Sequence, residues 1–205
     1  MATTGSASLT NLSVPVSDGS KNATMLQPKL GFRFRVTFIN FGTSGSSTAV
    51  LTRQIKDFTR PNVTFQEIPI DIYNSKIYLA GKHEWQQVSI NIIDDANGLA
   101  SQLISQQMQK QLDFAEQSAK AAGSDYKFMM RCEVLDGGNG ANDVQILETW
   151  ELYGCFIQST NYNQLAYSSN DALSIAVTVR FDNALLTSNG LSSVGVATGI
   201  GGTNS

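Results

Sequence analysis

The chain has 205 residues, of which 41% are hydrophobic and only 15% are charged, and its formal net charge is −3. This charge gives no broad basic field, so the composition argues against a protein that wraps around duplex nucleic acid. Apolar runs stay far below the ~18–20 residues that a membrane-spanning helix needs. Residues 1–20 lack the basic start and apolar core of a secretory signal, so we expect the chain to work in a reducing cytosol.

Alternation of apolar and polar residues predicts that strands dominate the chain. Residues 1–29 show no clear hydrophobic period, and we expect them to form an N-terminal arm. The expected strands, in chain order, cover residues 32–41, about 48–58, an extended hairpin from 63 to 81 that turns at Asn74-Ser75, 85–92, 126–135, 144–157 and 173–181. The first two of these strands would form a hairpin with each other.

The hydrophobic period changes between Asn97 and Ala122, where apolar residues recur every three to five positions. This stripe predicts one amphipathic helix and consists of Leu99, Leu103, Met108, Leu112, Ala115 and Ala119. An Asp or Asn at 94–97 is expected to cap its start, and Gly123 is expected to end it. Its polar face is rich in glutamine, which suits either a solvated face or a face that docks a partner.

These elements predict a mainly β protein, with a two-sheet β-sandwich or barrel and one flanking α-helix. The folded domain is expected to cover residues 30–184, after the arm of residues 1–29. Residues 183–205 contain no charge and are rich in Gly, Ser and Thr, so we expect residues 185–205 to form a flexible C-terminal tail.

Side chains that carry chemistry are scarce in this sequence. One histidine, His83, and two cysteines could supply three zinc ligands at most, whereas a zinc site needs about four. The loop from Asp136 to Asp143 lacks the ligand spacing of a calcium-binding EF-hand. We therefore predict no enzyme activity and no catalytic, cofactor-binding or metal-binding residues. Cys132 and Cys155 are expected to be buried free thiols.

Two groups of segments together resemble a known family. The first group is the stretch from Ile68-Pro69-Ile70 through Asn74-Ser75-Lys76 to Ala80-Gly81, followed by Trp85 and the strand 88–92. The second group is Trp150-Glu151-Leu152-Tyr153-Gly154, then Ser169-Asn170-Asp171, then the strand 175–182. In content and order they resemble the tail tube proteins of contractile-tailed bacteriophages, the T4-like tail tube family, over roughly residues 30–184.

The resemblance implies a phage tail tube-like fold whose sheets join edge to edge in a hexameric ring, closing into one large barrel. Such rings would stack into the inner tail tube of the virion, through which genomic DNA passes into the host without specific binding. The implied partners are further copies of the chain, the tail sheath protein outside, and baseplate and tail terminator proteins at the ends. Assembly would take place in the host cytoplasm, with no membrane and no cofactor involved.

The extended hairpin is longer than a connection between two core strands requires, and it carries apolar residues that a lone domain has little reason to expose. We therefore expect an inter-ring stacking site made of Ile72, Tyr73, Asn74, Lys76, Ile77, Tyr78 and Leu79. Two other functions stay open: a tube protein of a phage-like contractile injection system or a baseplate tube initiator, and a monomeric β-sandwich binding module.

Overall fold

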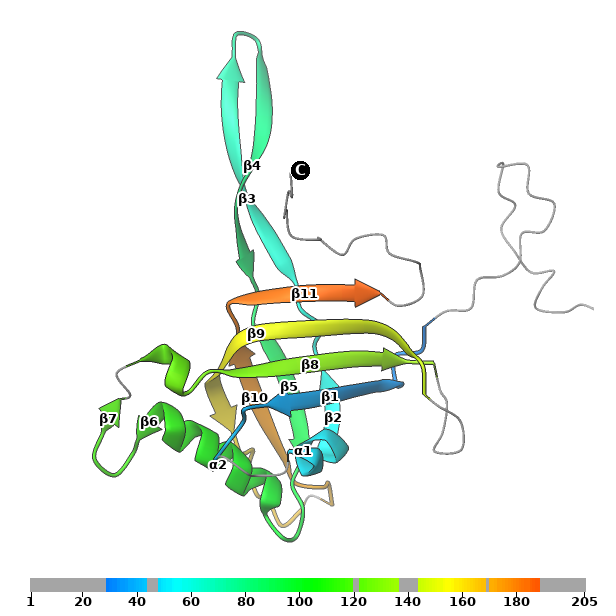
Figure 1. The fold of residues 1–205 in the computed structure, drawn as a ribbon, viewed down its shortest axis with the longest axis vertical. Coiled ribbons are helices and arrows are strands. Elements are labelled where there is room, and N and C mark those ends of the chain that lie inside the picture. Colours follow the sequence, from blue (N-terminus) through cyan, green and yellow to red (C-terminus); the bar gives the residue numbers. More distant parts are fainter. Residues whose placement is uncertain (1–28, 44–47, 120–121, 137–143, 169, 189–205) are drawn as a thin grey trace, which may run out of the picture. The chain divides into compact units, whose positions relative to one another are not determined.

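A computed structural model describes residues 29–43, 48–119, 122–136, 144–168 and 170–188 (Figure 1). Contacts divide the chain into a unit of residues 1–32 and a unit of residues 33–205, and the elements below all belong to the second unit. Most of the expected N-terminal arm, and the expected tail beyond residue 188, lie outside the described residues.

Seven antiparallel strands form the main sheet in the order β1-β8-β9-β10-β5-β2, and β11 pairs with β9 beside this path. Their bounds are β1 (Phe34–Ile39), β2 (Ile55–Phe58), β5 (Val88–Ile93), β8 (Phe128–Leu135), β9 (Ile146–Asn161), β10 (Ser174–Arg180) and β11 (Asn183–Ser188). The expectation of a mainly β protein is confirmed. Within the described part of the chain, none of the sheets closes into a barrel.

The long strand β9 belongs to two layers of this sheet. Its first part, up to Cys155, pairs with β8 and β11, and its last part, from Phe156 to Asn161, pairs with β10. Gly154 lies at the change of partners and has a φ of +67°, which glycine adopts more readily than other residues. Figure 1 shows β9 curving between the two sets of strands. The two layers are therefore parts of one bent sheet that share β9.

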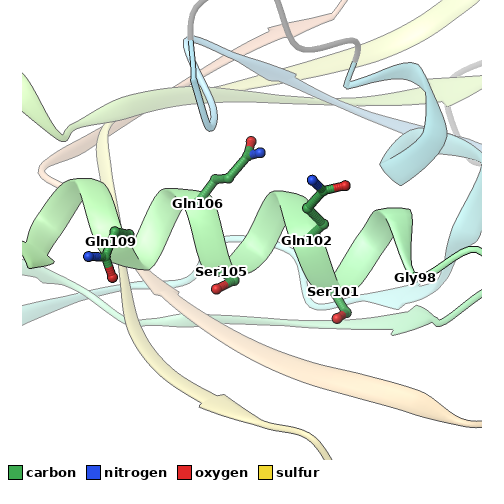
Figure 2. Close-up of a pocket in the computed structure, with 6 residues that line it drawn as sticks. All are labelled: Gly98, Ser101, Gln102, Ser105, Gln106 and Gln109. Atoms are coloured by element: carbon green, nitrogen blue, oxygen red, sulfur yellow. The ribbon is translucent and has the colours of Figure 1, made fainter. Parts of the chain in front are cut away.

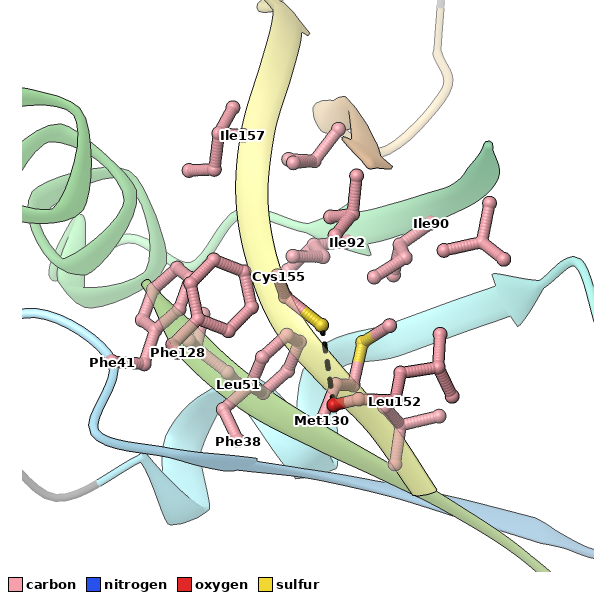
Figure 3. Packing of buried hydrophobic residues seen from close by; sticks show 14 of the residues in the cluster. Phe38, Phe41, Leu51, Ile90, Ile92, Phe128, Met130, Leu152, Cys155 and Ile157 are labelled. Atoms are coloured by element: carbon pink, nitrogen blue, oxygen red, sulfur yellow. Dashed lines mark hydrogen bonds between the residues drawn. The ribbon is translucent and has the colours of Figure 1, made fainter. Parts of the chain in front are cut away.

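Buried side chains from both layers meet in one core, as the period-two pattern predicts. Phe41 and Phe128 pack edge to face with ring centroids 4.9 Å apart (Figure 3). The fully buried members with large side chains include Leu51, Ile90, Ile92, Ile104, Met130, Leu152 and Ile175. Because each layer contributes side chains, neither layer can bury its apolar face without the other.

The segment after β1 differs from the prediction. Residues expected as a strand over about 48–58 form the helix α1 (Ala49–Gln54) followed by the short strand β2. Leu51 from α1 is fully buried, and the hydroxyl of Thr48 donates a hydrogen bond to the carbonyl of Phe38. β1 pairs with β8 and β2 pairs with β5, so the expected hairpin does not form. The protein thus has a second α-helix beside the single one that was predicted.

The predicted helix of residues 97–122 is shorter than expected. α2 covers Leu99–Gln111, and the Asp95 carboxylate accepts a hydrogen bond from the Leu99 amide near its start. Beyond α2, the Asp113 carboxylate accepts hydrogen bonds from the amides of Ala115 and Glu116. These bonds fold residues 112–119 into a small hairpin of β6 (Leu112–Asp113) and β7 (Ser118–Ala119). A short 3₁₀ turn, η2 (Gly123–Asp125), then leads to β8.

The C-terminal end of the domain also differs from the prediction. β11 begins at Asn183 and pairs with β9 from Tyr153 to Glu148, so residues 185–188 of the expected tail lie in a strand. Of its side chains, Ala184 is buried whereas Leu185 and Leu186 are about half exposed. An edge strand with so little burial lacks the alternation that makes a strand recognisable in sequence.

We expect Gly154→Ala to destabilise the fold more than Gly98→Ala. A Cβ at Gly154 would collide with the carboxylate of Asp182, whereas a Cβ at Gly98 would meet nothing within 4 Å. Both glycines have similar positive φ values. Backbone strain therefore lowers the free energy of unfolding of both variants by roughly 1–2 kcal/mol. Gly154→Ala is therefore expected to lose additional free energy of unfolding, because the new Cβ displaces Asp182 from its 2.6 Å ion pair with Lys127. Urea unfolding gives both values, and equal losses would contradict this explanation.

The expectation of buried free thiols is confirmed for Cys132 and Cys155. The Cys155 thiol donates a hydrogen bond to the Leu152 carbonyl (Figure 3). Burial raises the pKa of each cysteine to about 12, and the thiolate is the reactive form. At pH 8 we expect no reaction of the native protein with a thiol reagent over minutes, and two reactive thiols per chain after denaturation without reductant. Fewer than two thiols in denaturant would contradict the prediction.

Candidate functional site

The most distinctive feature outside the core is a long two-stranded hairpin. It consists of β3 (Val63–Ile72) and β4 (Ser75–Trp85), which pair from Val63↔Trp85 to Ile72↔Ser75. The hairpin extends away from the main sheet in Figure 1. Its turn is Tyr73-Asn74, one residue before the predicted tip, and Tyr73 has a φ of 46° and is almost fully exposed.

In the outer half of this hairpin, from residue 68 to residue 79, one face carries five aliphatic side chains and Ser75. Directly opposite residues of antiparallel strands share a face, and side chains alternate along each strand. The pairs Ile68↔Leu79, Ile70↔Ile77 and Ile72↔Ser75 therefore lie on one side. We call Ile68, Ile70, Ile72, Ile77 and Leu79 the aliphatic stripe. Each of them keeps between 41% and 49% of its surface exposed.

The opposite face of the hairpin is polar. It carries the pairs Glu67↔Ala80, Pro69↔Tyr78 and Asp71↔Lys76. The Lys76 ammonium lies 3.3 Å from the Asp71 carboxylate, an exposed ion pair of small energetic value. An amphipathic hairpin whose apolar face stays about half exposed among the described residues is typical of an interaction surface rather than of a core element.

The structure divides the predicted stacking residues between these two faces. Ile72, Ile77 and Leu79 belong to the aliphatic stripe, whereas Lys76 and Tyr78 lie on the polar face. Tyr73 and Asn74 form the turn between the strands. The predicted set does not contain Ile68 and Ile70, which share this face, although the alternation Ile68-Pro69-Ile70-Asp71-Ile72 indicates it in the sequence.

A bulge near the base sets which side chains share a face. Phe65 pairs with His83 and Glu67 pairs with Ala80, so Gly81 and Lys82 together lie opposite the single residue between them. A Cβ at Gly81 would lie 2.9 Å from the carbonyl oxygen of Gln66. This close backbone approach explains the glycine at this position.

Aromatic contacts and one ion pair attach the base of the hairpin to the core. Phe65, His83, Trp85 and Phe181 follow one another with ring centroids 5.7–6.3 Å apart. The Arg180 guanidinium donates to the Glu84 carboxylate at 2.9 Å. His83 and Glu84 are thus parts of this attachment.

The outward face of the β1, β8 and β9 layer carries charges that neutralise one another. Arg35 lies 2.6 Å from the Glu133 carboxylate, and Arg131 donates two hydrogen bonds to the Glu151 carboxylate. The Tyr153 hydroxyl donates to the other Glu151 oxygen at 2.6 Å. Hydrogen bonds from Tyr153 and Arg131 lower the pKa of Glu151, and the same bond raises the pKa of Tyr153.

Strand edges differ in how open they are. In the described chain no strand pairs with the outer edges of β1, β2 and β11. At the last part of β9, the Gln111 side chain takes the place of a neighbouring strand. Its amide nitrogen donates to the Ile157 carbonyl at 3.0 Å, and its oxygen accepts from the Ile157 amide at 2.8 Å.

The glutamines of α2 serve two different purposes. Gln107 is fully buried, with its oxygen bound to the Gly42 amide at 2.8 Å and its nitrogen to the Tyr126 carbonyl at 2.7 Å. The remaining polar face lines an open hollow of about 490 Å³ formed by Gly98, Ser101, Gln102, Ser105, Gln106 and Gln109 (Figure 2). All of these lining side chains are uncharged, so the hollow contains no acidic or basic side chain.

A search of the described residues finds no group of three or more His, Cys, Asp or Glu side chains that could hold a metal ion. Residues 137–143 of the loop considered for calcium lie outside that part of the chain. Among the described helices, none has the length and hydropathy to cross a membrane. The hairpin and the sheet edges are therefore the features on which a function can be argued.

Comparison with known proteins identifies the fold but no sequence family. No protein-family model matches the sequence. No curated protein sequence matches it either. Several solved structures, however, match most of the chain.

A chain of the anti-feeding prophage (AFP) tube-terminating cap has a TM-score of 0.60 at 11% identity, covering 84% of this chain and 99% of that chain. A chain of the AFP baseplate has a TM-score of 0.57 at 14% identity, covering 82% and 100%. A chain of the sheath–tube complex of PVC, an extracellular contractile injection system, has a TM-score of 0.56 at 13% identity, covering 78% and 92%. The protein therefore has the fold of chains from the tubes, caps and baseplates of contractile injection systems.

Proposed function

We propose that this protein is a structural tube subunit of a contractile phage tail or of a phage-like contractile injection particle, and not an enzyme. The fold match over 92–100% of the AFP and PVC chains carries this proposal. The amphipathic hairpin supports it independently, because an exposed aliphatic stripe suits a protein that polymerises. The motifs shared with T4-like tail tube proteins favour a phage tail, and the AFP and PVC matches favour an injection particle.

In this proposal six copies close into a ring through the edges of β1 and β11. The layer β1-β8-β9-β11 is antiparallel throughout, and an even number of strands leaves β1 and β11 running in opposite directions. A neighbour related by rotation then presents its β1 antiparallel to β11, so the ladder of hydrogen bonds continues from copy to copy. Closure of the ring removes exposed strand edges that otherwise favour aggregation.

The outward face of this layer would form the wall of the channel. There the Arg35–Glu133 and Arg131–Glu151 pairs compensate positive charge. A neutral wall lets genomic DNA, the cargo implied for a phage tail, pass without the phosphate contacts that would retain it. Sheath protein outside, and baseplate and terminator proteins at the ends, are the proposed partners of the tube, with assembly in the host cytoplasm.

Size-exclusion chromatography with negative-stain electron microscopy tests the proposal. A tube subunit is expected to give rings or tubes with a hollow axis. A monomeric β-sandwich module, the remaining alternative, would elute near 22.1 kDa at all concentrations and show no particles of this kind. The monomer result at high micromolar concentration, in a correctly folded sample, would overturn the proposed function.

A further inference from the structure

We infer that the aliphatic stripe of one copy packs against an apolar loop at the opposite end of the next copy. The end loop is defined by Tyr162, Leu165, Tyr167 and Leu173, which lie between β9 and β10. This inference rests on the proposed tube function and names the surface that receives the hairpin.

The hairpin and the end loop lie at opposite ends of the same layer. β5 and β10 pair from Val88↔Val179 at one end to Ile93↔Ser174 at the other. The hairpin leads into β5 at the Val88 end through Trp85. The end loop leads into β10 at Ser174, which is the Ile93 end. In Figure 1 the hairpin accordingly extends from one end of β5, and the connection between β9 and β10 lies beyond the other.

The end loop carries large apolar side chains that are exposed in the described part of the chain. Leu165 is 79% exposed and Tyr167 is fully exposed, and Tyr162 and Leu173 are each more than two fifths exposed. Residues 161–170 contain no charged side chain, and the acidic groups next to this stretch are Asp171 and, beside Tyr162, Asp94. The stripe and the end loop therefore match in chemistry.

The ends of the loop are held in place, which reduces the entropy lost on binding. The Asn163 side chain donates to the Ser174 carbonyl at 2.7 Å and to its hydroxyl at 3.0 Å. The Leu173 carbonyl accepts a hydrogen bond from the Asp94 amide at 2.9 Å. Burial, assisted by the nearby charge of Asp94, raises the pKa of Tyr162. Leu165 and Tyr167 project from this fixed base.

The reach of the hairpin fits a contact with another copy. Ten residues of β3 extend about 33 Å at roughly 3.3 Å per residue, and the stripe occupies the half farthest from the core. A contact between unlike ends repeats without closing and gives a filament, whereas stripe-to-stripe pairing would be two-fold and would stop at pairs. Head-to-tail packing of stripe on end loop thus accounts for both exposed apolar surfaces.

Complementation between two variants tests the inference. Ile70→Ser/Ile77→Ser removes the stripe, and Leu165→Ser/Tyr167→Ser removes the end loop. Each variant alone is expected to form rings but no tubes. Mixed after each has assembled by itself, the two are expected to give stacks of two rings that do not grow, because the mixture contains one intact stripe surface and one intact end loop. Electron microscopy and sedimentation velocity measure the stacks.

Phe114→Ser is the matched control, since Phe114 is an exposed aromatic residue outside both surfaces, and it should assemble as the unchanged protein does. Tyr167→Ser alone leaves the packing inside the subunit unchanged, because Tyr167 is fully exposed. It should still lower the association constant between rings at least tenfold. Normal tubes from the end-loop variants, or a mixture that forms no ring pairs, would overturn the inference and leave the tube function standing. Failure of the unchanged protein to form rings or tubes would overturn both.

Discussion

Ile70→Ser/Ile77→Ser is expected to abolish tube formation while leaving the fold intact. The two isoleucines are directly opposite each other in the aliphatic stripe, and burial of such a side chain contributes roughly 1–2 kcal/mol at ~25 cal/mol per Å². Losing about 2–4 kcal/mol at every contact between rings lowers the association constant roughly 30-fold to 1,000-fold. Circular dichroism checks the fold, and electron microscopy with a critical-concentration measurement checks the tubes.

Tyr78→Ser is the control for this prediction, because Tyr78 is 62% exposed but lies on the polar face of the same hairpin. It is expected to leave the critical concentration within about threefold of the unchanged protein. If Tyr78→Ser abolished the tubes and the double isoleucine variant did not, the stacking surface would be the polar face. Loss of the native circular dichroism spectrum would instead mean that the hairpin is part of the folding core.

Gln107→Leu is expected to lower the free energy of unfolding by about 2–6 kcal/mol. Leucine nearly fills the volume of the glutamine, but it leaves the Gly42 amide and the Tyr126 carbonyl without their partners at 2.8 and 2.7 Å. Each buried polar group left unsatisfied costs about 1–3 kcal/mol. Denaturant unfolding followed by tryptophan fluorescence measures the change.

Gln102→Leu is the matched control on the same helix, since Gln102 is exposed. It should change stability by no more than about 0.5 kcal/mol, as most surface substitutions do. Equal effects of the two substitutions would show that the hydrogen bonds of Gln107 contribute nothing beyond those of a surface glutamine.

The strands with one buried face could be predicted because their alternation records the burial directly. Val36 and Phe38 in β1, and Ile175, Val177 and Val179 in β10, are all buried. The helix α1 could not be predicted in the same way. Its six residues are too short for a helical period, and the burial of Leu51 against the other layer decides the conformation.

The candidate site was only partly predictable for a related reason. Sequence shows that the hairpin carries too many apolar residues, but their division between two faces depends on the pairing register. That register shifts at the two-for-one bulge at Gly81 and Lys82, and the shift places Ile77 instead of Tyr78 opposite Ile70. Gln107 was missed because a buried glutamine and a solvated one look identical in a sequence. Only the facing Gly42 and Tyr126 backbone groups distinguish them.

The Gln111 side chain has a consequence for how the protein avoids misassembly. By occupying the amide and the carbonyl of Ile157, one side chain terminates a sheet that would otherwise present a template for foreign strands. If the protein polymerises as proposed, it meets its own copies at high local concentration, where every open strand is a site for disordered aggregation. Because this site is occupied from within the monomer, the edges of β1 and β11 stay the open ones, and in the proposed ring they pair with neighbouring copies; ordered growth is then favoured over amorphous precipitation.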